Sequence, residues 1–300
     1  MFDIIGKRKW YFLFSFLMIV PGVVSLFLWG LNLSIDFTGG SRTTLVFPQP
    51  VNEQKIETVE KAFEAKGIDV VTIQPSGDRV VVRTKPLDDK QNAAVLVELK
   101  KTAGEFTQDE FETIGPVIGQ EITLNAFKAI GVASLVIIFY IAWSFRGVRK
   151  PASSWRFGVC AIAALIHDAL FVIGVFSILG HFFGVEVDSL FVTAILTVIG
   201  FSVHDTIVVF DRIRENLKRT AGVPFGQVVN DSLLQTLVRS LNTSWTTLLV
   251  LFTLLLFGGE TIRWFVFALF IGMLSGTYSS IFNAAQLLVA WQDWIEKRKK

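Results

Sequence analysis

The stretch Val187–Asn216, VDSLFVTAILTVIGFSVHDTIVVFDRIREN, decides the fold of this chain. Its first 24 residues, Val187–Phe210, are mostly apolar, and a helix of about 20 such residues crosses the ~30 Å hydrocarbon layer of a membrane. Asp205 lies six residues before the charged run that starts at Asp211, which is about 9 Å along a helix. A carboxylate at that depth is costly unless it is paired, hydrated or protonated. The stretch therefore predicts a transmembrane helix that carries a protonatable group, Asp205, near one end.

The composition of the whole chain is typical of a polytopic membrane protein. Of 300 residues, 52% are hydrophobic, 28 are Phe and 8 are Trp, and the mean hydropathy is +0.54. The single cysteine, Cys160, lies in an apolar run, which excludes an intrachain disulfide. The sequence has no His/Cys metal spacing, phosphate-binding loop or dinucleotide fingerprint. We therefore expect no metal, no cofactor, no nucleic-acid partner and no enzymatic activity within the chain.

Apolar runs along the chain predict six transmembrane helices. The runs are Trp10–Leu31, Leu124–Ser144, Phe157–Leu179, Val187–Phe210, Val238–Phe257 and Trp264–Ala290. The first run follows Lys7-Arg8-Lys9 as a signal peptide would, but it is too long and no small-residue cleavage site follows it, so we expect an uncleaved span. The predicted division is 1–31 for the N-terminus and first helix, 32–123 for a soluble domain, 124–292 for helices two to six, and 293–300 for a basic tail.

The lysines and arginines of the short segments gather on one side of the predicted membrane. That side holds Lys7, Arg8, Lys9, Arg146, Arg149, Lys150, Arg156, Arg212, Arg214, Lys218, Arg219, Arg239 and Lys297–Lys300. The loops His181–Glu186 and Gly258–Arg263 on the other side hold only Arg263. Because cytoplasmic loops carry the excess of Lys and Arg, we expect a multi-pass protein of the cell (inner) membrane with both termini cytoplasmic and residues 32–123 extracytoplasmic.

The segment Asn32–Thr123 has the pattern of a small α+β domain. Strands are predicted at Arg42–Phe47, Val70–Gln74, Arg79–Thr84 and Phe111–Ile114, and helices at Asn52–Lys66 and Asp88–Thr102. The order β-α-β-β-α-β is that of ferredoxin-like folds. The segment contains no His, no Cys and no nucleophile–base set, which favours a handling or docking surface, with a structural cap on the membrane part as the alternative.

Two glycine motifs flank this predicted domain. The first is Asp36-Phe37-Thr38-Gly39-Gly40, and the second is Gly115-Pro116-Val117-Ile118-Gly119. Glycines permit positive φ and sharp changes of direction, while proline restricts its own φ. Asp36, Gly39, Gly40, Gly115, Pro116 and Gly119 are therefore candidate hinge residues. A fixed elbow is the equally weighted alternative.

The predicted spans hold more polar residues than anchoring requires. Candidates for a proton relay or polar path are His167, Asp168, Thr206, Thr243 and Thr247. The alternative is that the hydroxyls bond back to their own helix carbonyls and that His167 and Asp168 satisfy neighbouring polar groups.

Asp205, His204 and Arg239 form the main candidate site. Asp205 and Arg239 belong to the cytoplasmic halves of consecutive spans, so they are candidates for a pair. A pairing that changes with protonation can couple proton entry to helix movement, and a proton falling through 100 mV yields about 2.3 kcal/mol. The alternative is that Arg239 extends to the interface and Asp205 is a static partner.

The chain resembles the SecF members of the SecD/SecF family of protein-export membrane proteins over essentially its whole length. The resemblance rests on DFTGG at Asp36–Gly40, GPVIG at Gly115–Gly119, DTIVVFDRIREN at Asp205–Asn216, RSLNTSWTTLL at Arg239–Leu249, FGGETIR at Phe257–Arg263 and GTYSSIFNA at Gly276–Ala284. The departure is His204, where such relatives usually carry Asn. A histidine there titrates near neutral pH and could tune Asp205 or join a relay.

The resemblance implies a heterodimer with SecD, related to resistance-nodulation-division exporters. Such a pair uses the proton-motive force to promote preprotein translocation through SecYEG after the ATP-driven step of SecA. It implies that Asp205 is the essential transmembrane aspartate and Arg239 the arginine of the conducting path, with YajC and YidC as further candidate partners and membrane lipids around the chain. The coupling ion is expected to be H⁺, with Na⁺ as an alternative.

Two other functions remain open at this point. One is half of a small-molecule exporter of the resistance-nodulation-division type, although that class has much larger extracytoplasmic insertions. The other is a non-transporting membrane scaffold, which would need no buried carboxylate.

Overall fold

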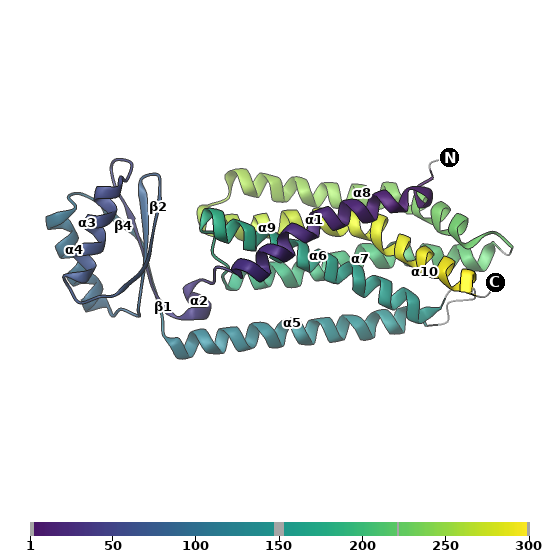
Figure 1. Ribbon diagram of the computed structural model, residues 1–300, viewed down its shortest axis with the longest axis horizontal. Helices are drawn as coiled ribbons and strands as arrows, with labels where there is room; N and C mark the ends of the chain where they lie inside the picture. Colours follow the sequence, from purple (N-terminus) through teal and green to yellow (C-terminus); the bar gives the residue numbers. More distant parts are fainter. Residues whose placement is uncertain (1–2, 147–152, 221, 299–300) are drawn as a thin grey trace. The chain divides into compact units, whose positions relative to one another are not determined.

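The computed structural model describes residues 3–146, 153–220 and 222–298, so the predicted cytoplasmic cations Arg149, Lys150, Lys299 and Lys300 lie outside the described residues. The chain divides into two compact units (Figure 1). The helical unit comprises Met1–Leu31, Ala129–Val185 and Leu190–Lys300, and the sheet unit comprises Asn32–Lys128 and Glu186–Ser189. The sheet unit thus contains the segment expected to be soluble, together with residues 124–128 and a short piece far along the chain, 186–189.

Six helices of the described chain are long and apolar enough to cross a membrane, which confirms the predicted six spans. After a 3₁₀ turn, η1 (Ile5–Lys7), the helices are α1 (Arg8–Trp29), α5 (Pro116–Ser144), α6 (Ser154–Phe183), α7 (Ser189–Arg219), α8 (Phe225–Phe257) and α9 (Glu260–Ser279), which continues through the π-helical η2 (Ser280–Ala284) into α10 (Ala285–Arg298). Helices are favoured here because each one pairs its own backbone N–H and C=O groups, and the hydrocarbon layer offers these groups no other hydrogen-bond partner.

All the spanning helices except α1 are longer than their apolar runs, and α5, α7 and α8 are examples. α5 begins at Pro116, eight residues before Leu124, because proline is well suited to the first helical position. α8 begins at Phe225, and α7 continues to Arg219, nine residues beyond Phe210. In that extension of α7, ion pairs three and four residues apart, such as Arg219–Glu215, support the helix in water. Hydropathy marks the part of a helix that crosses hydrocarbon and not its ends.

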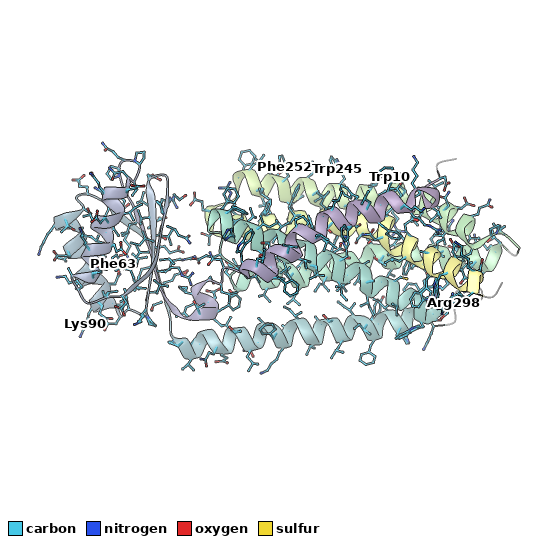
Figure 2. All side chains as sticks on the ribbon, viewed as in Figure 1. Trp10, Phe63, Lys90, Trp245, Phe252 and Arg298 are labelled. Atoms are coloured by element: carbon cyan, nitrogen blue, oxygen red, sulfur yellow. The ribbon has the colours of Figure 1, made fainter. Side chains whose placement is uncertain are left out.

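Small residues set the closest helix approach in the helical unit. α1 and α6 meet at Gly22 and Gly174, where a Cβ on Gly22 would lie 2.7 Å from the Gly174 Cα. Nearby, the hydroxyls of Ser25 and Ser177 are 2.8 Å apart. Contacts of this kind allow two helix backbones to pack without intervening side chains. On the outside of the unit, large apolar side chains project away from the protein, as Figure 2 shows for Trp10, Trp245 and Phe252.

The sheet unit has the ferredoxin-like order predicted from the sequence. After the short α2 (Ile35–Thr38), its elements are β1 (Gly40–Val46), α3 (Glu53–Glu64), β2 (Val70–Ser76), β3 (Arg79–Thr84), α4 (Asp89–Thr102) and β4 (Thr107–Ile114). The strands lie in the order β2-β3-β1-β4, and every neighbouring pair is antiparallel. The turn between β2 and β3 is tighter than predicted, because Pro75 and Ser76 still pair with β3.

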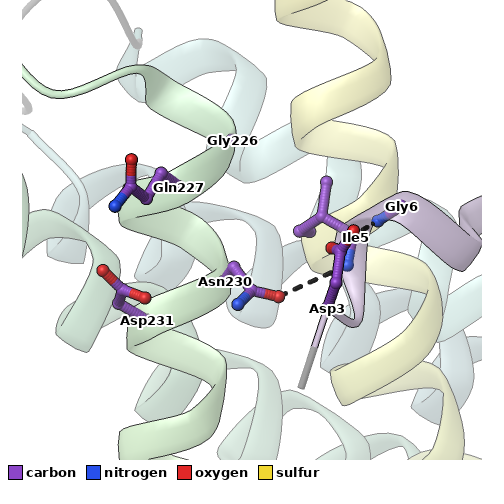
Figure 3. A pocket seen from close by; sticks show the side chains of 7 residues that line it. All are labelled: Asp3, Ile5, Gly6, Gly226, Gln227, Asn230 and Asp231. Carbon is purple, nitrogen blue, oxygen red and sulfur yellow. Dashed lines mark hydrogen bonds between the residues drawn. The ribbon is translucent and has the colours of Figure 1, made fainter. Parts of the chain in front are cut away.

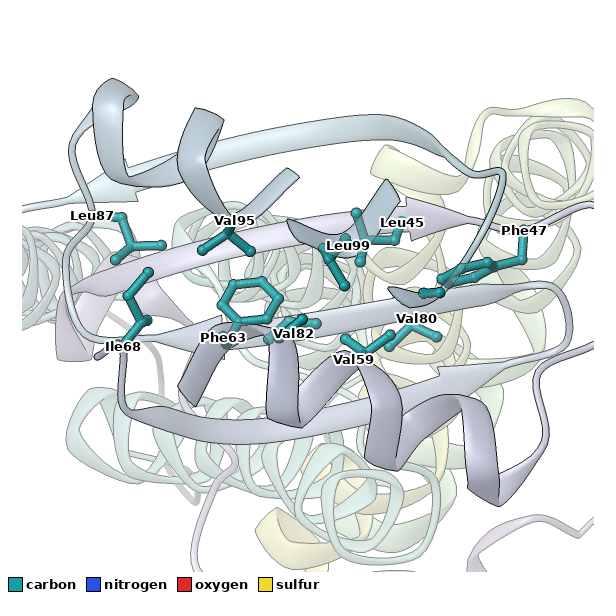
Figure 4. Packing of buried hydrophobic residues seen from close by; sticks show 12 residues of the cluster. Leu45, Phe47, Val59, Phe63, Ile68, Val80, Val82, Leu87, Val95 and Leu99 are labelled. Atoms are coloured by element: carbon teal, nitrogen blue, oxygen red, sulfur yellow. The ribbon is translucent and has the colours of Figure 1, made fainter. Parts of the chain in front are cut away.

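Helices α3 and α4 cover one face of this sheet (Figure 4). Alternate residues of β1 and β3, including Leu45, Val80 and Val82, are fully buried against Phe63 of α3 and Leu99 of α4. Both helices start at residues that cap their free N–H groups. The Asn52 side chain accepts a hydrogen bond from Lys55 N, and Asp88 forms a capping box with Gln91.

Candidate functional site

Asp205 is buried in the helical unit, with 3% of its surface exposed. Its Oδ2 accepts a hydrogen bond of 3.3 Å from the Ser244 hydroxyl of α8. The Ser244 hydroxyl accepts a bond of 2.7 Å from Thr277 of α9. We call Asp205, Ser244 and Thr277 the Asp205 cluster; it joins three membrane helices through one carboxylate and two hydroxyls.

The expected pair of Asp205 with Arg239 is not formed within the part of the chain that the structure describes. Arg239 is exposed on α8, and His204 is exposed on α7. Helix geometry explains both positions, because successive residues are about 100° apart around an α-helix. Arg239 lies five positions before Ser244 and so points about 140° away from it, while His204 points about 100° away from Asp205.

A second carboxylate, Asp168 of α6, lies in a denser polar cluster and is 1% exposed. It accepts hydrogen bonds from three serine hydroxyls and faces the ring of its neighbour His167. The distances are 2.6 Å from Ser202 Oγ, 2.8 Å from Ser275 Oγ, 2.5 Å from Ser279 Oγ and 3.0 Å from His167 Nδ1. We call these five residues the Asp168 cluster; it connects α6, α7 and α9.

The Asp168 cluster extends to α1 through the π-helical turn η2. The Asn283 side-chain oxygen accepts a hydrogen bond of 2.8 Å from Ser15, so its amide nitrogen faces His167 Nε2 at 3.0 Å. With the amide in this orientation, Nε2 accepts from Asn283 and Nδ1 donates to Asp168. Both nitrogens of the His167 ring therefore have a partner, one an amide and the other a carboxylate.

The threonines proposed for a polar path divide into two groups. Thr206 is buried, and its hydroxyl lies 2.9 Å from that of Ser280. Thr243 and Thr247 instead donate to carbonyls of their own helix, at Arg239 and Thr243. For these two residues the structure favours the alternative interpretation of helix back-bonding.

The sequence analysis allowed for a polar neighbour of Asp168 but identified neither Ser202 nor Ser275. Ser275 and Ser279 are four residues apart and so share one face of α9, a spacing visible in the sequence. Ser202 carries no such signal, because only the packing of α7 against α6 brings it to Asp168. Gly276 contributes by its small size, since a Cβ there would lie 3.3 Å from Ser202 Cβ and 3.7 Å from Asp168 Oδ2.

The two glycine motifs pack directly on one another in the sheet unit. Gly39 and Gly40 have φ of +70° and +126°, and a Cβ on Gly40 would lie 2.7 Å from the Thr84 carbonyl oxygen. A Cβ on Gly119 would lie 3.0 Å from Gly39 N, and one on Gly39 would lie 3.0 Å from Pro116 Cα. Backbone contacts this close favour the fixed elbow over the hinge. Gly115 has a negative φ and open space around it, so packing does not require a glycine there.

The outward side of α7 is polar, although the helix spans a membrane. Between residues 190 and 210, the exposed residues of this helix are small or polar except Leu190 at its start: Thr193, Thr197, Gly200 and His204. We call these four residues the α7 outer face. α8 likewise exposes Arg239, Asn242, Thr243 and Thr246. Charged and polar side chains in membrane helices face protein or a water-filled cavity and not lipid.

A pocket of about 430 Å³ opens at the start of α8 (Figure 3). Its lining includes Asp3, Asn230 and Asp231, and the Asn230 side-chain oxygen already accepts hydrogen bonds from the Ile4 and Ile5 N–H groups. The pocket includes no member of either aspartate cluster. Among the described residues, no three His, Cys, Asp or Glu side chains are placed to hold a metal ion together.

Two family models match the chain. The model for the C-terminal part of the protein export membrane proteins SecD and SecF matches residues 94–294, and the model for the SecD/SecF GG motif matches residues 24–51. The chain belongs to the SecD/SecF family. The GG-motif match contains Asp36, Gly39 and Gly40. The longer match contains every residue of both aspartate clusters.

Similar SecD/SecF proteins cover the chain almost completely. The protein translocase subunit SecF of Thermobaculum terrenum is 48% identical over 98% of this chain and 95% of the relative. That of Anaerolinea thermophila is 42% identical over 100% of this chain and 99% of the relative. The protein translocase subunit SecDF of Bacillus subtilis is 39% identical, and here the match spans 97% of this chain but only 38% of the relative.

A solved structure of the family has the same fold. The crystal structure of SecDF from Thermus thermophilus, described as a translocon-associated membrane protein, matches with a TM-score of 0.84 and 36% identity. The match covers 97% of this chain and 39% of the SecDF chain. The chain is therefore a multi-pass membrane protein of the SecD/SecF type that corresponds to part of the longer SecDF chains.

Proposed function

We propose that this chain is the SecF-type subunit of the protein-export machinery and that, with SecD, it uses the proton-motive force to promote preprotein translocation. Relatives that match it end to end are named protein translocase subunit SecF. The observation that carries the coupling part of the proposal is Asp205, a buried carboxylate that accepts a hydrogen bond from Ser244 of α8, whose hydroxyl in turn accepts one from Thr277 of α9. In this role the chain is an accessory subunit and not an enzyme.

A SecD partner is supported by two independent observations. In the relatives named SecDF, a sequence like this one makes up 38% or 39% of a longer chain. In addition, the exposed His204 of α7 and the exposed Arg239 of α8 need a polar or hydrated neighbour inside the membrane. A SecD helix bundle against these two helices would supply it. SecYEG, SecA, YajC and YidC are the further partners that this function implies.

Protonation of Asp205 is the proposed coupling event. An ionised carboxylate accepts the Ser244 hydrogen bond, whereas a protonated one gains an O–H that must itself find an acceptor. Ser244 and Thr277 would then exchange donor and acceptor roles, which changes how α7 contacts α8 and α9. A proton that crosses 100 mV supplies about 2.3 kcal/mol, enough to shift such an equilibrium about 50-fold. His204 and Arg239, on the outward surfaces of α7 and α8, would line the path by which the proton arrives.

The proposed orientation follows the distribution of basic residues. Both termini lie in the cytoplasm, the sheet unit lies outside it, and the membrane is the inner (cell) membrane. Cysteines introduced at Lys85 in the sheet unit and at Lys297 of α10 would test this orientation, because a membrane-impermeant reagent should label only the first in intact cells.

A vesicle assay tests the function. Inverted vesicles that hold SecYEG, SecD and this chain receive SecA, ATP and a preprotein, and translocation is measured with and without a proton gradient. Asp205→Asn should abolish the stimulation by the gradient while the ATP-driven step remains. Asp211→Asn is the matched control, since Asp211 lies on the same helix but is exposed. Full stimulation in Asp205→Asn would refute the proposal and leave the scaffold hypothesis.

The coupling ion is proposed to be H⁺, and the same vesicles can test it. Stimulation should persist in Na⁺-free buffer and disappear with a protonophore. Stimulation that requires Na⁺ and survives the protonophore would assign the Asp205 cluster to sodium instead.

A further inference from the structure

The four residues that precede or begin α7 belong to the sheet unit although they are far from it in sequence. Val187 forms a parallel β-bridge with Leu33. Its N–H donates to the Asn32 carbonyl at 2.8 Å, and its carbonyl accepts from Ser34 N–H at 2.9 Å. Val187 is 3% exposed and Ser34 is 2% exposed, so this bridge is shielded from water.

A buried ion pair joins the same segment to the sheet. Arg83 of β3 donates to Glu186 at 3.1 Å, and their side chains are only 10% and 13% exposed. The second Arg83 nitrogen donates to the Thr38 hydroxyl at 3.1 Å. By the alternation of strand residues, Arg83 lies on the face of the sheet opposite α3 and α4. Arg42, its cross-strand neighbour on β1, is occupied by Glu110 and Glu112 of β4.

The first residue of α7 is held by a carboxylate of the first glycine motif. Asp36 Oδ2 accepts a hydrogen bond of 2.8 Å from Ser189 N–H. The first N–H groups of a helix have no partner within the helix, and a negative charge beside them is stabilising. The Asp36 side chain thus ties the fixed elbow at Gly39 and Gly40 to the start of α7.

The helix that starts here also carries Asp205. α7 is continuous from Ser189 to Arg219 and contains no proline. Asp205 lies 16 residues after Ser189, which is about 24 Å along the helix. No break in the backbone hydrogen bonding of α7 separates its first turn from Asp205, so the helix connects the two directly.

We propose that Leu33–Thr38, Arg83 and Glu186–Ser189 form a latch that makes the start of α7 part of the sheet unit and passes movement of α7 to the sheet through the Arg83–Glu186 ion pair. Arg83, Glu186 and Asp36 are positioning residues in this proposal, since they act on Asp205 only through α7. The proposal rests on the proposed function of Asp205 as the site of coupling. It names the Arg83–Glu186 ion pair as the contact through which the sheet unit responds to a change at Asp205.

Hydrogen exchange on the full-length protein in lipid nanodiscs tests whether the latch exists. Arg83→Gln should raise the exchange rate of the Val187 and Ser189 amides about tenfold, because it leaves Glu186 buried without its partner. The double variant Arg83→Glu/Glu186→Arg should restore protection. Lys85→Gln is the matched control, since Lys85 is in an exposed ion pair with Asp69 close to the same strand. Unchanged exchange in Arg83→Gln would overturn the latch.

A double-variant cycle tests whether the latch is coupled to Asp205. Asp205→Asn, which imitates the protonated carboxyl, should change the exchange of the Val187 and Ser189 amides in the otherwise natural chain. The same substitution in the Arg83→Gln background should leave those amides unaffected. An equal effect of Asp205→Asn in both backgrounds, or in neither, would overturn the coupling. A destabilised but uncoupled protein would not produce this pattern.

The hydrogen-exchange measurements test the latch separately from the translocation assay. Exchange requires neither SecD nor a preprotein, so the latch can fail while gradient-driven translocation still depends on Asp205. If Arg83→Gln does not fold, Asp36→Asn weakens the same latch at the helix start and should raise exchange at Ser189 alone. Protection of Ser189 in Asp36→Asn equal to that of the natural chain would also count against the proposal.

Discussion

Two aspartates in the membrane helices differ in how completely their oxygens are bonded. Asp168 accepts from three serine hydroxyls and the His167 ring, whereas within the described residues Asp205 accepts one hydrogen bond, from Ser244 at 3.3 Å. A carboxylate with several donors is fixed in position, because any movement breaks several bonds at once. Asp168 therefore suits an anchor of α6, α7 and α9, and Asp205 suits a group whose protonation changes.

Removal of Asp168 should be far more damaging to the fold than removal of Asp205. Asp168→Ala removes the carboxylate that accepts from three buried serine hydroxyls, of which Ser279 still has the Gly276 carbonyl as an acceptor, and should cost about 3 kcal/mol or more of stability. Asp205→Asn retains an acceptor for Ser244 and should cost less than about 1 kcal/mol. Thermal unfolding followed by tryptophan fluorescence would compare them. Equal losses would contradict the distinction between anchor and switch.

Glu186 makes the stability of the sheet unit depend on pH. Burial raises the pKa of Glu186 above its ordinary value of 4.5, and the repulsion of Asp188 acts in the same direction, although Arg83 and Arg42 oppose the shift. A carboxyl with a raised pKa in the folded state binds its proton more tightly than in the unfolded state. Its contribution to stability is therefore complete below 4.5 and is lost as the pH rises through the folded-state pKa.

Glu186→Gln should remove this part of the pH dependence. As the pH rises above 4.5, the melting temperature of the natural chain should fall relative to that of the Glu186→Gln variant. Asp69→Asn, which alters an exposed carboxylate, is the control. The melting temperature of the natural chain should not fall relative to that of this variant as the pH rises above 4.5. A difference that stays constant across the range would contradict the assignment.

At the scale of elements, glycines determine how the helices cross. α1 and α6 approach at Gly22 and Gly174 so closely that neither position has room for a methyl group. Gly272 and Gly276 similarly bring α9 against Val198 and Ser202 of α7. These approaches set the rotation of each helix and hence which side chains meet, including the serines around Asp168.

A methyl group at the α1–α6 crossing should separate the two helices. Gly174→Ala should cost about 1–3 kcal/mol, since the added Cβ would lie 2.6 Å from the Gly22 Cα. Gly131→Ala on α5 is the matched control, because nothing lies within 4 Å of its Cβ position. Alanine is the better helix former, so the control should be neutral or slightly stabilising. Melting temperatures of the two variants in the same lipid would decide the matter.

At the scale of the whole molecule, the helical unit exposes two kinds of surface. α5 exposes apolar side chains such as Val136 and Phe139, which suit lipid. The exposed side chains of His204, Arg239 and Asn242 on α7 and α8 do not suit lipid, so this side of the unit needs a partner or water beside these three residues.

Association with SecD should cover the α7 outer face. With Cys160 replaced by alanine, Thr197→Cys should react with a membrane-permeant maleimide in the chain expressed alone and several-fold more slowly when SecD is co-expressed. Val136→Cys on α5, which is 61% exposed, is the control and should react equally in both cases. Unaltered labelling of Thr197→Cys would place the SecD contact elsewhere.

The sequence by itself determined the six spans, the ferredoxin-like order of the sheet unit and the place of Asp205 on a membrane-spanning helix. These features depend on hydropathy and periodicity, which are local along the chain. Only the tertiary structure decided that Asp205 bonds to Ser244 and not to Arg239, that serines from two other helices hold Asp168, and that Glu186 reaches Arg83. The physical reason is that these contacts depend on the rotation of each helix about its axis and on pairings of residues 34 to 111 positions apart. Close packing at small residues sets both, and hydropathy does not encode them.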